Sequence, residues 1–257
     1  MLSTNDIHYR AGNKEILQGI TTCFEPGLFH VIVGPNGSGK STFLKVFSGE
    51  LRPQEGTVSY NGENVFHIDK AGLAKRRAVM SQEPELHFPL TVSEVVMMGR
   101  YPHFDFRPGK YDEHVCRFAM MLADVSEFAN RDYLTLSGGE KQRVHFARVL
   151  AQIGGEEVVD KFLFLDEAVS HLDLKHQRQL LQITKKFCDN RFTAIVILHD
   201  INLSLTYADR ILFMKEGRIA YELKHRNQIT PAILKDVFDV DTTIIYPNEC
   251  ERPVVVF

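Results

Sequence analysis

The sequence predicts an α/β fold with a mostly parallel central sheet. Short, wholly apolar runs at 30–33, 162–165 and 193–198 are typical of strands that are buried on both faces. The first run is followed by a glycine-rich loop and then by an apolar-periodic segment at 43–47, which is the order strand, turn, helix. A mostly helical stretch over 90–129 interrupts this alternation, so we expect an inserted helical subdomain.

The N-terminal part is predicted to form short strands over 2–33, with turns at Gly12-Asn13 and Pro26-Gly27. Tyr9 lies in the first strand. Its ring could stack on a nucleotide base, although a half-buried structural tyrosine is the more common explanation for such a residue.

The loop at 34–42 fits the pattern G-x-x-x-x-G-K-[ST] in full. Its glycines let backbone N–H groups turn toward an anion, and a helix beginning near Lys40 adds the positive end of its dipole. The pattern predicts that Lys40 contacts the β- and γ-phosphates and that Ser41 binds Mg²⁺. A glycine-rich turn with a capping lysine is the alternative, but the flanking strand and helix favour a nucleotide. The predicted nucleotide-binding residues are Gly34, Pro35, Asn36, Gly37, Ser38, Gly39, Lys40, Ser41 and Thr42.

Turn residues over 49–62 surround a predicted strand at 57–60, and a further strand at 78–80 runs into Gln82. An amide at the end of a strand can reach a metal ion or a water molecule. A solvated loop glutamine is the alternative for Gln82.

The predicted helical block is broken at 101–108, which contains two prolines and several aromatic residues. Its outer edges, near Gln82 and Thr135, are the expected hinges between this block and the rest of the chain.

A second anion site is predicted where the next helix begins. Ser137 and Glu140 have the S-x-x-E spacing of a capping box, and Gly138 and Gly139 between them expose backbone N–H groups at the positive end of the helix. A simple capped helix start is the alternative. Because the loop at 34–42 already surrounds its own phosphates, we expect the second site to hold a nucleotide bound by another copy of the chain.

Two carboxylates, Asp166 and Glu167, follow the apolar strand 162–165. Carboxylates at the end of a core strand are costly unless they meet a cation or hydrogen bonds, and Mg²⁺ beside a nucleotide is such a cation. We expect Asp166 to hold the metal, directly or through water, and Glu167 to orient the water that attacks the γ-phosphate.

His199 follows the strand at 193–198. Ligands bind at the carboxyl ends of parallel strands, so Gly34, Gln82, Asp166 and His199 would meet at one edge of the sheet if their four strands are parallel. The tail over 211–257 is predicted to contain a strand at 211–214, a helix near 231–238 and a final edge strand at 254–257.

Composition excludes several classes of protein. The net charge of −3 gives no support for nucleic-acid binding, and four scattered cysteines indicate neither a zinc site nor a disulfide framework. We expect no signal peptide, and no stretch reaches the roughly 18 apolar residues needed to span a bilayer. Any link to a membrane is therefore expected to go through a partner.

Over its whole length the chain resembles the ATP-binding subunit of ABC transporters. Walker A is the loop 34–42, the Q-loop glutamine is Gln82, the signature LSGGE is 136–140, and Walker B with its glutamate is 162–167. The D-loop is 170–173, with Ser170 and Asp173 as its site residues; the switch histidine is His199, and Tyr9 falls at the adenine-stacking aromatic.

A finer resemblance links the chain to importers of metal chelates, namely haem, ferric siderophores and cobalamin. The segments 87–103 and 199–210 fit that group, and the extra residues between Ala151 and the Walker B strand are most like haem importers. Two departures affect the D-loop region: Ala168-Val169 replaces the usual Pro-Thr, and His171 replaces the usual alanine. They put the interface geometry of the family in doubt, but not the catalytic pair.

The resemblance implies an α/β fold of the P-loop NTPase type, ABC class, with a mostly parallel core sheet, an antiparallel β subdomain and an inserted helical subdomain. The single domain 1–257 would consist of a core, 1–82 and 136–257, and a helical subdomain, 83–135. Glu167 and His199 would be catalytic, Ser41, Gln82 and Asp166 would hold Mg²⁺ as the cofactor, and ATP would be the substrate.

The resemblance also implies partners. Two copies would form a homodimer around two ATP molecules, with residues 137–140 of one copy contacting the γ-phosphate in the other. The dimer would bind an integral membrane permease dimer at the cytoplasmic face of the inner membrane, and a periplasmic binding protein would deliver the substrate. We expect the break at 101–108 and the loop after Gln82 to contact the permease, with Arg100 and His103 exposed on that surface.

The function implied is therefore an ATP hydrolase that drives metal-chelate import, with haem favoured over ferric siderophores or cobalamin. A soluble ABC ATPase of translation or DNA repair is the alternative from another class; such proteins usually carry fused ATPase domains or a long coiled coil, and this chain has one phosphate loop. A nucleotide-binding module without turnover is a third alternative, and Lys40, Asp166, Glu167 and His199 argue against it.

Overall fold

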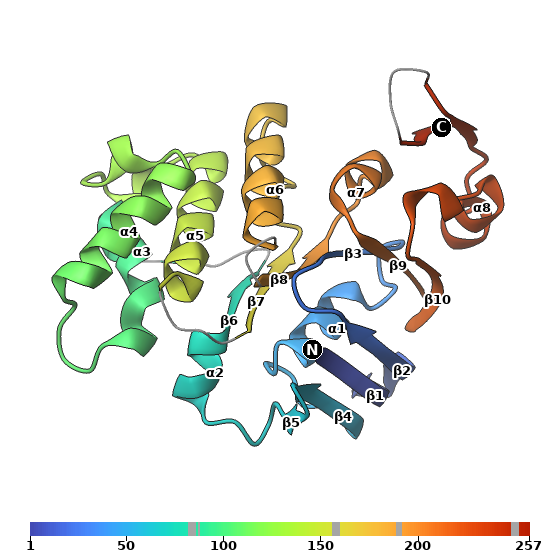
Figure 1. The fold of residues 1–257 in the computed structure, drawn as a ribbon, viewed down its shortest axis with the longest axis horizontal. Helices are drawn as coiled ribbons and strands as arrows, with labels where there is room; N and C mark the ends of the chain where they lie inside the picture. The colour runs from blue at the N-terminus through green and yellow to red at the C-terminus, as the bar shows by residue number, and fades with distance from the viewer. Residues whose placement is uncertain (82–85, 87, 156–159, 189–191, 248–251) are drawn as a thin grey trace.

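The computed structural model describes residues 1–81, 86, 88–155, 160–188, 192–247 and 252–257. They form a large sheet covered by helices, a second sheet at one end and a small C-terminal ribbon (Figure 1). Within the described ranges, no helix is both long enough and apolar enough to cross a membrane.

The larger sheet contains β3 (Phe29–Val33), β6 (Arg77–Met80), β7 (Lys161–Asp166), β8 (Phe192–Ile197), β9 (Arg210–Lys215) and β10 (Arg218–Leu223). Their order is β10-β9-β3-β8-β7-β6, and all neighbours are parallel except β10 and β9. Every residue of β3 and β7 is buried, as expected for strands covered on both faces. The predicted parallel sheet is confirmed.

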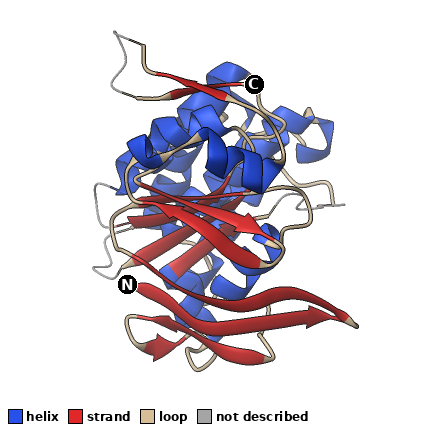
Figure 2. Ribbon diagram, turned by 90° about the vertical axis from the view of Figure 1, so that its right-hand side faces the viewer, coloured by secondary structure: helices blue, strands red, loops and turns tan. Residues whose placement is uncertain are grey.

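The smaller sheet is antiparallel and contains β1 (Leu2–Ala11), β2 (Lys14–Phe24), β4 (Glu55–Tyr60) and β5 (Glu63–Asn64) in the order β2-β1-β4-β5. Figure 2 shows its long strands at the bottom of the molecule. The turn at Gly12-Asn13 is confirmed, but the prediction of short strands is wrong for β1 and β2. Register shifts along their pairing let both strands continue through irregular positions.

Helix α1 (Lys40–Phe47) packs between the two sheets. Its Phe43 and Phe47 belong to a buried cluster that also contains Leu2 of the smaller sheet and Ile197 of the larger one. This cluster fixes the helix, and therefore the loop before it, relative to both sheets.

The helical block contains α3 (Val92–Met97), the 3₁₀ helix η1 (Met98–His103), α4 (Lys110–Leu122) and the 3₁₀ helices η2 (Ser126–Phe128) and η3 (Tyr133–Thr135). They pack on α5 (Gly138–Ile153). A Cβ at Gly99 would lie 2.2 Å from the carbonyl oxygen of Arg148, so only glycine lets η1 approach α5 this closely. The predicted block is confirmed, but its break begins after His103 rather than at Tyr101, because η1 continues through Pro102.

Arg100 is not on the surface, and the expectation that it is exposed there is wrong. Its side chain is buried; Nε lies 2.9 Å from Asp112 Oδ1, and Nη1 donates to the carbonyl oxygens of Ala151 and Gly154 at 2.9 and 2.8 Å. His103 is part-buried, with Nε2 2.7 Å from the carbonyl oxygen of Gln152. Arg100 therefore ties η1, α4 and the end of α5 together.

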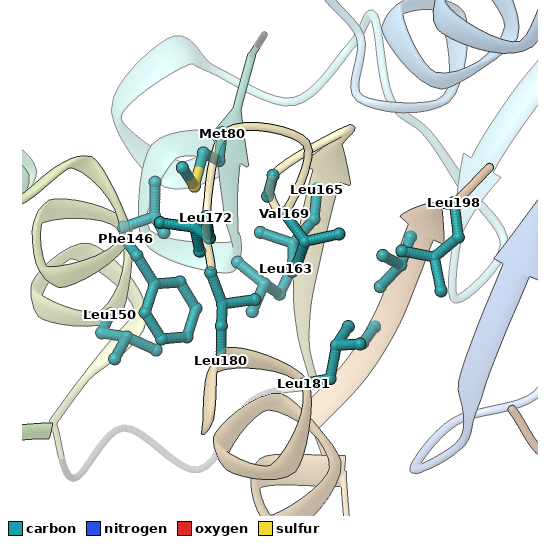
Figure 3. Packing of buried hydrophobic residues seen from close by; sticks show 14 of the residues in the cluster. Met80, Phe146, Leu150, Leu163, Leu165, Val169, Leu172, Leu180, Leu181 and Leu198 are labelled. Atoms are coloured by element: carbon teal, nitrogen blue, oxygen red, sulfur yellow. The ribbon is translucent and has the colours of Figure 1, made fainter. Parts of the chain in front are cut away.

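The core continues from β7 into the segment that follows it. Val169 and Leu172 insert beside Met80, Leu163 and the helices α5 and α6 (Leu174–Cys188), as Figure 3 shows. Ala168 is also buried, so the residues that replace the usual Pro-Thr serve as core side chains.

The remaining elements are α2 (Lys70–Arg76), α7 (Ile201–Tyr207), the 3₁₀ helix η4 (Arg226–Gln228), α8 (Pro231–Phe238), β11 (Thr243–Ile245) and β12 (Val254–Val256). The predicted helix at 231–238 is confirmed. The predicted final edge strand is confirmed as β12, which pairs with β11 in a separate two-stranded sheet. The side chain of Asn202 binds both main-chain groups of Val255 and fixes the strand against α7.

Candidate active site

The loop after β3 needs glycine at its first position. Gly34 has a φ of +156°, and a Cβ there would lie 2.2 Å from the carbonyl oxygen of Met214 on β9. Gly39 precedes α1 with a φ of +99° and brings the loop back to the start of the helix. The loop is therefore held between the neighbouring strand and the helix N-terminus, where backbone N–H groups favour an anion.

Lys40 lies over this loop. Its Nζ donates to the carbonyl oxygens of Gly34 and Pro35 at 2.9 and 3.0 Å, and its side chain is buried. Burial lowers the pKa of Lys40, while the nearby carboxylates of Glu167 and Asp166 act in the opposite direction. The ammonium group is thus positioned at the loop by contacts that a phosphate oxygen can replace.

Asp166 is the last residue of β7 and is 3% exposed. Ser41 Oγ donates to its Oδ1 at 3.0 Å. Burial raises the pKa of Asp166, and the hydrogen bond from Ser41 lowers it only in part. A buried carboxylate beside a hydroxyl is a suitable pair of oxygen ligands for Mg²⁺, whose charge would compensate the burial.

No cluster of three or more His, Cys, Asp or Glu residues in the described part of the chain could hold a metal by itself. This fits Mg²⁺, which usually takes one or two protein ligands and completes its shell with phosphate oxygens and water. Gln82, the third predicted ligand, lies outside the described residues.

Glu167 has a φ of +52°, a backbone conformation that residues other than glycine rarely adopt. Its carbonyl oxygen accepts three hydrogen bonds: from Ser170 N–H at 3.1 Å, from Ser170 Oγ at 2.9 Å and from Gln142 Nε2 at 3.4 Å. Such a conformation costs about 1–3 kcal/mol and persists only where its surroundings enforce it. Here the hydrogen bonds from Ser170 and Gln142 hold this conformation, which turns the Glu167 carboxylate out of the line of β7.

The Glu167 carboxylate meets His199 from the end of β8. Glu167 Oε1 lies 2.6 Å from His199 Nε2, and the two side chains are 14% and 47% exposed. A mostly buried carboxylate held by an imidazole is suited to accept a hydrogen bond from water and to keep that water in place.

Lys40, Ser41, Glu167 and His199 line a cavity of about 630 Å³. The predicted convergence at one edge of the sheet is therefore observed for the segments after β3, β7 and β8. Four described residues of the loop 34–42 and the predicted metal site do not line this cavity: Gly34, Pro35, Ser38 and Asp166. Sequence reasoning missed two residues of its wall, Lys14 and Ile16 on β2. The residues lining the cavity are Lys14, Ile16, Asn36, Gly37, Gly39, Lys40, Ser41, Thr42, Glu167 and His199.

Tyr9 is not among the described residues that line this cavity. It pairs with Leu17 across the hairpin and packs, partly buried, against the cluster around α1. In the same hairpin, Ile16 of β2 is the apolar residue whose side chain lines the cavity. No local signal at Lys14 or Ile16 could have found them, because their position depends on how the hairpin lies over the loop.

The second anion site is a capped helix start. Ser137 and Glu140 bind each other's backbone N–H groups at the beginning of α5, as the capping-box prediction required. Nothing lies within 4 Å of a Cβ built on Gly138, so the backbone there is open to solvent or a partner, whereas a Cβ on Gly139 would lie 3.4 Å from the carbonyl oxygen of His171. These residues do not line the cavity described above within the same chain.

The D-loop residues are fixed by hydrogen bonds. Asp173 caps α6 through His176 N–H at 2.9 Å, and this contact holds the pKa of Asp173 below its ordinary value. Gln177 Nε2 donates to the carbonyl oxygens of Val169 and Leu172. His171 is exposed, and its Nδ1 lies 3.2 Å from Ser170 Oγ.

Comparison with known proteins connects this geometry to a family. A family model described as ABC transporter matches residues 17–170. The hemin import ATP-binding protein HmuV of Pseudomonas entomophila (strain L48) is 39% identical over 256 residues, covering 100% of this chain and 99% of that protein. HmuV of Escherichia coli O157:H7 is 36% identical over 257 residues, with the same coverage.

Two solved structures show the same fold. An inward-facing metal-chelate type ABC transporter has a TM-score of 0.82 at 23% identity, covering 99% of this chain and 96% of that one. The dimeric structure of MJ0796, a bacterial ABC transporter cassette, has a TM-score of 0.77 at 27% identity, covering 88% of this chain and 99% of that one.

Proposed function

Because this chain belongs to the ABC transporter family as an ATP-hydrolysing subunit, we propose that it drives the import of haem through a membrane permease. The observation that supports haem as the substrate is the full-length sequence identity of 36–39% to proteins named for hemin import. Import of a ferric siderophore or cobalamin is the nearest alternative within the same group of metal-chelate importers.

In the proposed reaction, the backbone of the loop 34–42 binds the phosphates of ATP, and Lys40 transfers its hydrogen bonds from the loop carbonyls to the β- and γ-phosphates. Ser41 and Asp166 would hold Mg²⁺, together with Gln82, and the ion would neutralise charge on the phosphates. Glu167 accepts a hydrogen bond from the attacking water, and His199 keeps its carboxylate in place. The 2.6 Å contact between Glu167 and His199 supports these two roles.

The signature residues Ser137, Gly138, Gly139 and Glu140 are proposed to act in trans. They lie away from the cavity of their own chain, and a structurally similar cassette forms a dimer. In a homodimer, each open helix start would contact the γ-phosphate bound by the partner, while Ser170 and Asp173 of the D-loop would lie at the interface. ATP would thus be needed on both sides to close the dimer.

The closing motion is proposed to reach a permease dimer through Gln82 and the helical block, residues 83–135. In this proposal the chain would lie at the cytoplasmic face of the inner membrane, and a periplasmic binding protein would supply the haem. Because Arg100 is buried, we propose that the permease contacts exposed side chains nearby instead, such as Tyr101 of η1 and Phe106 of the break, which are 59% and 97% exposed.

Growth on defined iron sources tests the substrate. A strain lacking this gene should fail to grow with haem as its iron source, and wild-type protein should restore growth while the Glu167→Gln variant should not. Growth on a ferric siderophore should be unaffected. Loss of siderophore or cobalamin use with intact haem use would exclude haem as the substrate.

Co-purification tests the class of protein. The tagged chain should be recovered from detergent-solubilised membranes with an integral membrane protein. Recovery with ribosomes or DNA would instead support the soluble alternative, and absence of phosphate release from ATP would support a binding module without turnover.

A further inference from the structure

A second cavity lies behind the active site, between α6, α7 and β12. One lobe has a volume of about 300 Å³ and a second lobe about 220 Å³, and Arg178, Leu203, Thr206 and Arg252 line both. None of its lining residues belongs to the cavity beside the loop 34–42.

The wall of this cavity is held in place by specific contacts. Asn202 Nδ2 donates to the carbonyl oxygen of Val255 at 3.0 Å, and Val255 N–H donates back to Asn202 Oδ1 at 2.8 Å. The side chain of Asn202 thus pairs with β12 as a neighbouring strand would, and Val255 is buried beneath it. This pairing keeps Arg252 opposite α6.

Besides Thr206, whose hydroxyl donates to the carbonyl oxygen of Asn202, four side-chain donors line the second lobe: Arg178 and Gln182 from α6, Tyr207 from α7, and Arg252. Within the described part of the chain, none of these four donors makes a hydrogen bond or an ion pair. Arg178 and Arg252 line the same lobe, from α6 and from the segment before β12, and both act electrostatically on the Tyr207 hydroxyl. Two guanidinium groups in one lobe repel each other, and an anion bound between them would remove this repulsion.

The acidic side chain in the wall belongs to the other lobe. Asp200 lines only the larger lobe, and its Oδ1 already accepts the N–H of Leu203 at the start of α7. The larger lobe also contains Leu174, Leu203 and Pro253, which give it an apolar surface. A ligand would therefore place its charge by the arginines and any carbon skeleton along these residues.

We propose that this cavity binds a small dianion, either a phosphate group or a pair of carboxylates, between Arg178 and Arg252. Guanidinium groups form paired, charge-assisted hydrogen bonds to both kinds of group. Gln182 and Tyr207 supply two further donors to the same ligand.

Calorimetric titration tests the proposal with inorganic phosphate and sodium succinate as separate probes. The full chain is first saturated with MgADP, so that the loop 34–42 cannot bind the probe. Wild-type protein should bind at least one probe saturably at one site per chain. The probe that binds shows whether the site takes a phosphate group or a pair of carboxylates.

The variants R178Q and R252Q should each weaken binding about tenfold or more, since each removes a charge-assisted pair of hydrogen bonds. R226Q is the matched control, because Arg226 is an exposed arginine outside the cavity, and it should bind as wild type does. Absence of saturable binding of both probes to the wild-type chain would overturn the proposal without recourse to any variant. Unchanged affinity in R178Q and R252Q would overturn it as well.

Discussion

At the scale of single residues, the site depends on a backbone conformation at Glu167 that the rest of the structure has to enforce. Three donors from Ser170 and Gln142 hold its carbonyl oxygen, and the carboxylate then points to His199. Gln142 belongs to α5, the helix that begins with the signature. The orientation of Glu167, the proposed general base, is therefore connected by one hydrogen bond to the helix whose start is proposed to contact the other nucleotide.

Replacement of Glu167 by glutamine should slow ATP turnover by about 10²–10⁴-fold, because the amide cannot act as a general base toward water. ATP binding should persist, since the loop 34–42 and Asp166 are unchanged. Phosphate release and nucleotide titration measure the two effects separately.

Glu216→Gln is the matched control for this substitution. Glu216 also has a positive φ, +49°, but lies in an exposed turn after β9. Its variant should hydrolyse ATP at the wild-type rate. Near-normal turnover in Glu167→Gln would remove Glu167 from its catalytic role and leave His199 as the first alternative.

Lys40→Ala should weaken ATP binding about tenfold or more, because a charge-assisted contact to phosphate is lost. A titration with a fluorescent ATP analogue measures the change, and Lys70→Ala, an exposed lysine outside the cavity, should bind as wild type does. Equal affinity in Lys40→Ala and wild type would mean that Lys40 does not reach the phosphates.

Sequence reasoning located those parts of the site that depend on local conformation. The loop 34–42 could be predicted because glycine spacing, strand and helix determine its backbone together. The positive φ of Glu167 could not, because its hydrogen bonds come from Gln142, 25 residues away, and from the turn after it. Lys14 and Ile16 were missed for a related reason, since the hairpin that carries them belongs to another sheet.

At the scale of the elements, Arg100 and Asp112 hold the helical block together. Burial alone would raise the pKa of Asp112, but the hydrogen bond from Gly109 N–H and the Arg100 guanidinium outweigh it and hold the pKa below its ordinary value. Arg100 was expected on the permease-contacting surface, but its partners Asp112, Ala151 and Gly154 lie far away in the sequence, so no local pattern showed its burial. In the structure, 3₁₀ geometry includes Pro102 and turns Arg100 inward.

Arg100→Gln should destabilise the protein by about 3–5 kcal/mol, because it leaves Asp112 as a buried charge without its cation. Urea unfolding measures the loss, and Arg107→Gln, an exposed arginine in the following loop, should leave the free energy of unfolding nearly unchanged. A similar small effect for both variants would contradict the structural role of Arg100.

The pH dependence of unfolding provides a second measurement of the same contact. Because the folded-state pKa of Asp112 is lowered, its contribution is fully present above the ordinary value of 3.8 and is lost as pH falls below it. Wild-type protein should lose this part of its stability in acid. The Arg100→Gln variant should lose less stability over the same pH interval, because the guanidinium group that helps to lower the pKa of Asp112 is absent.

At the scale of the whole molecule, the proposed ATP site is divided between two surfaces of the chain. The loop 34–42 and Glu167 line one cavity, while the open start of α5 at Ser137 lies outside it. The alternation of strands and helices predicted the core sheet well, because each apolar run becomes a buried strand. It predicted β12 but neither its partner strand β11 nor its attachment to α7, because Asn202 supplies strand-like hydrogen bonds from a helix.

The Glu167→Gln variant should elute as a dimer with MgATP and as a monomer with MgADP on a sizing column. With hydrolysis blocked, ATP remains bound between the loop 34–42 of one chain and Ser137 of the other. Light scattering on the eluting peak gives the mass. Elution as a monomer with MgATP at all protein concentrations would contradict a closed dimer held by the nucleotide alone.

The order of strands in the larger sheet has a consequence for biosynthesis. β3 leaves the ribosome early, but its two neighbours, β8 and β9, are completed only at residues 197 and 215. A nascent chain therefore carries its central strand unpaired through most of translation, including synthesis of the helical block. Because Gly34 packs against Met214 of β9, the strand that confines the first residue of the phosphate loop is completed only in the last stage of synthesis.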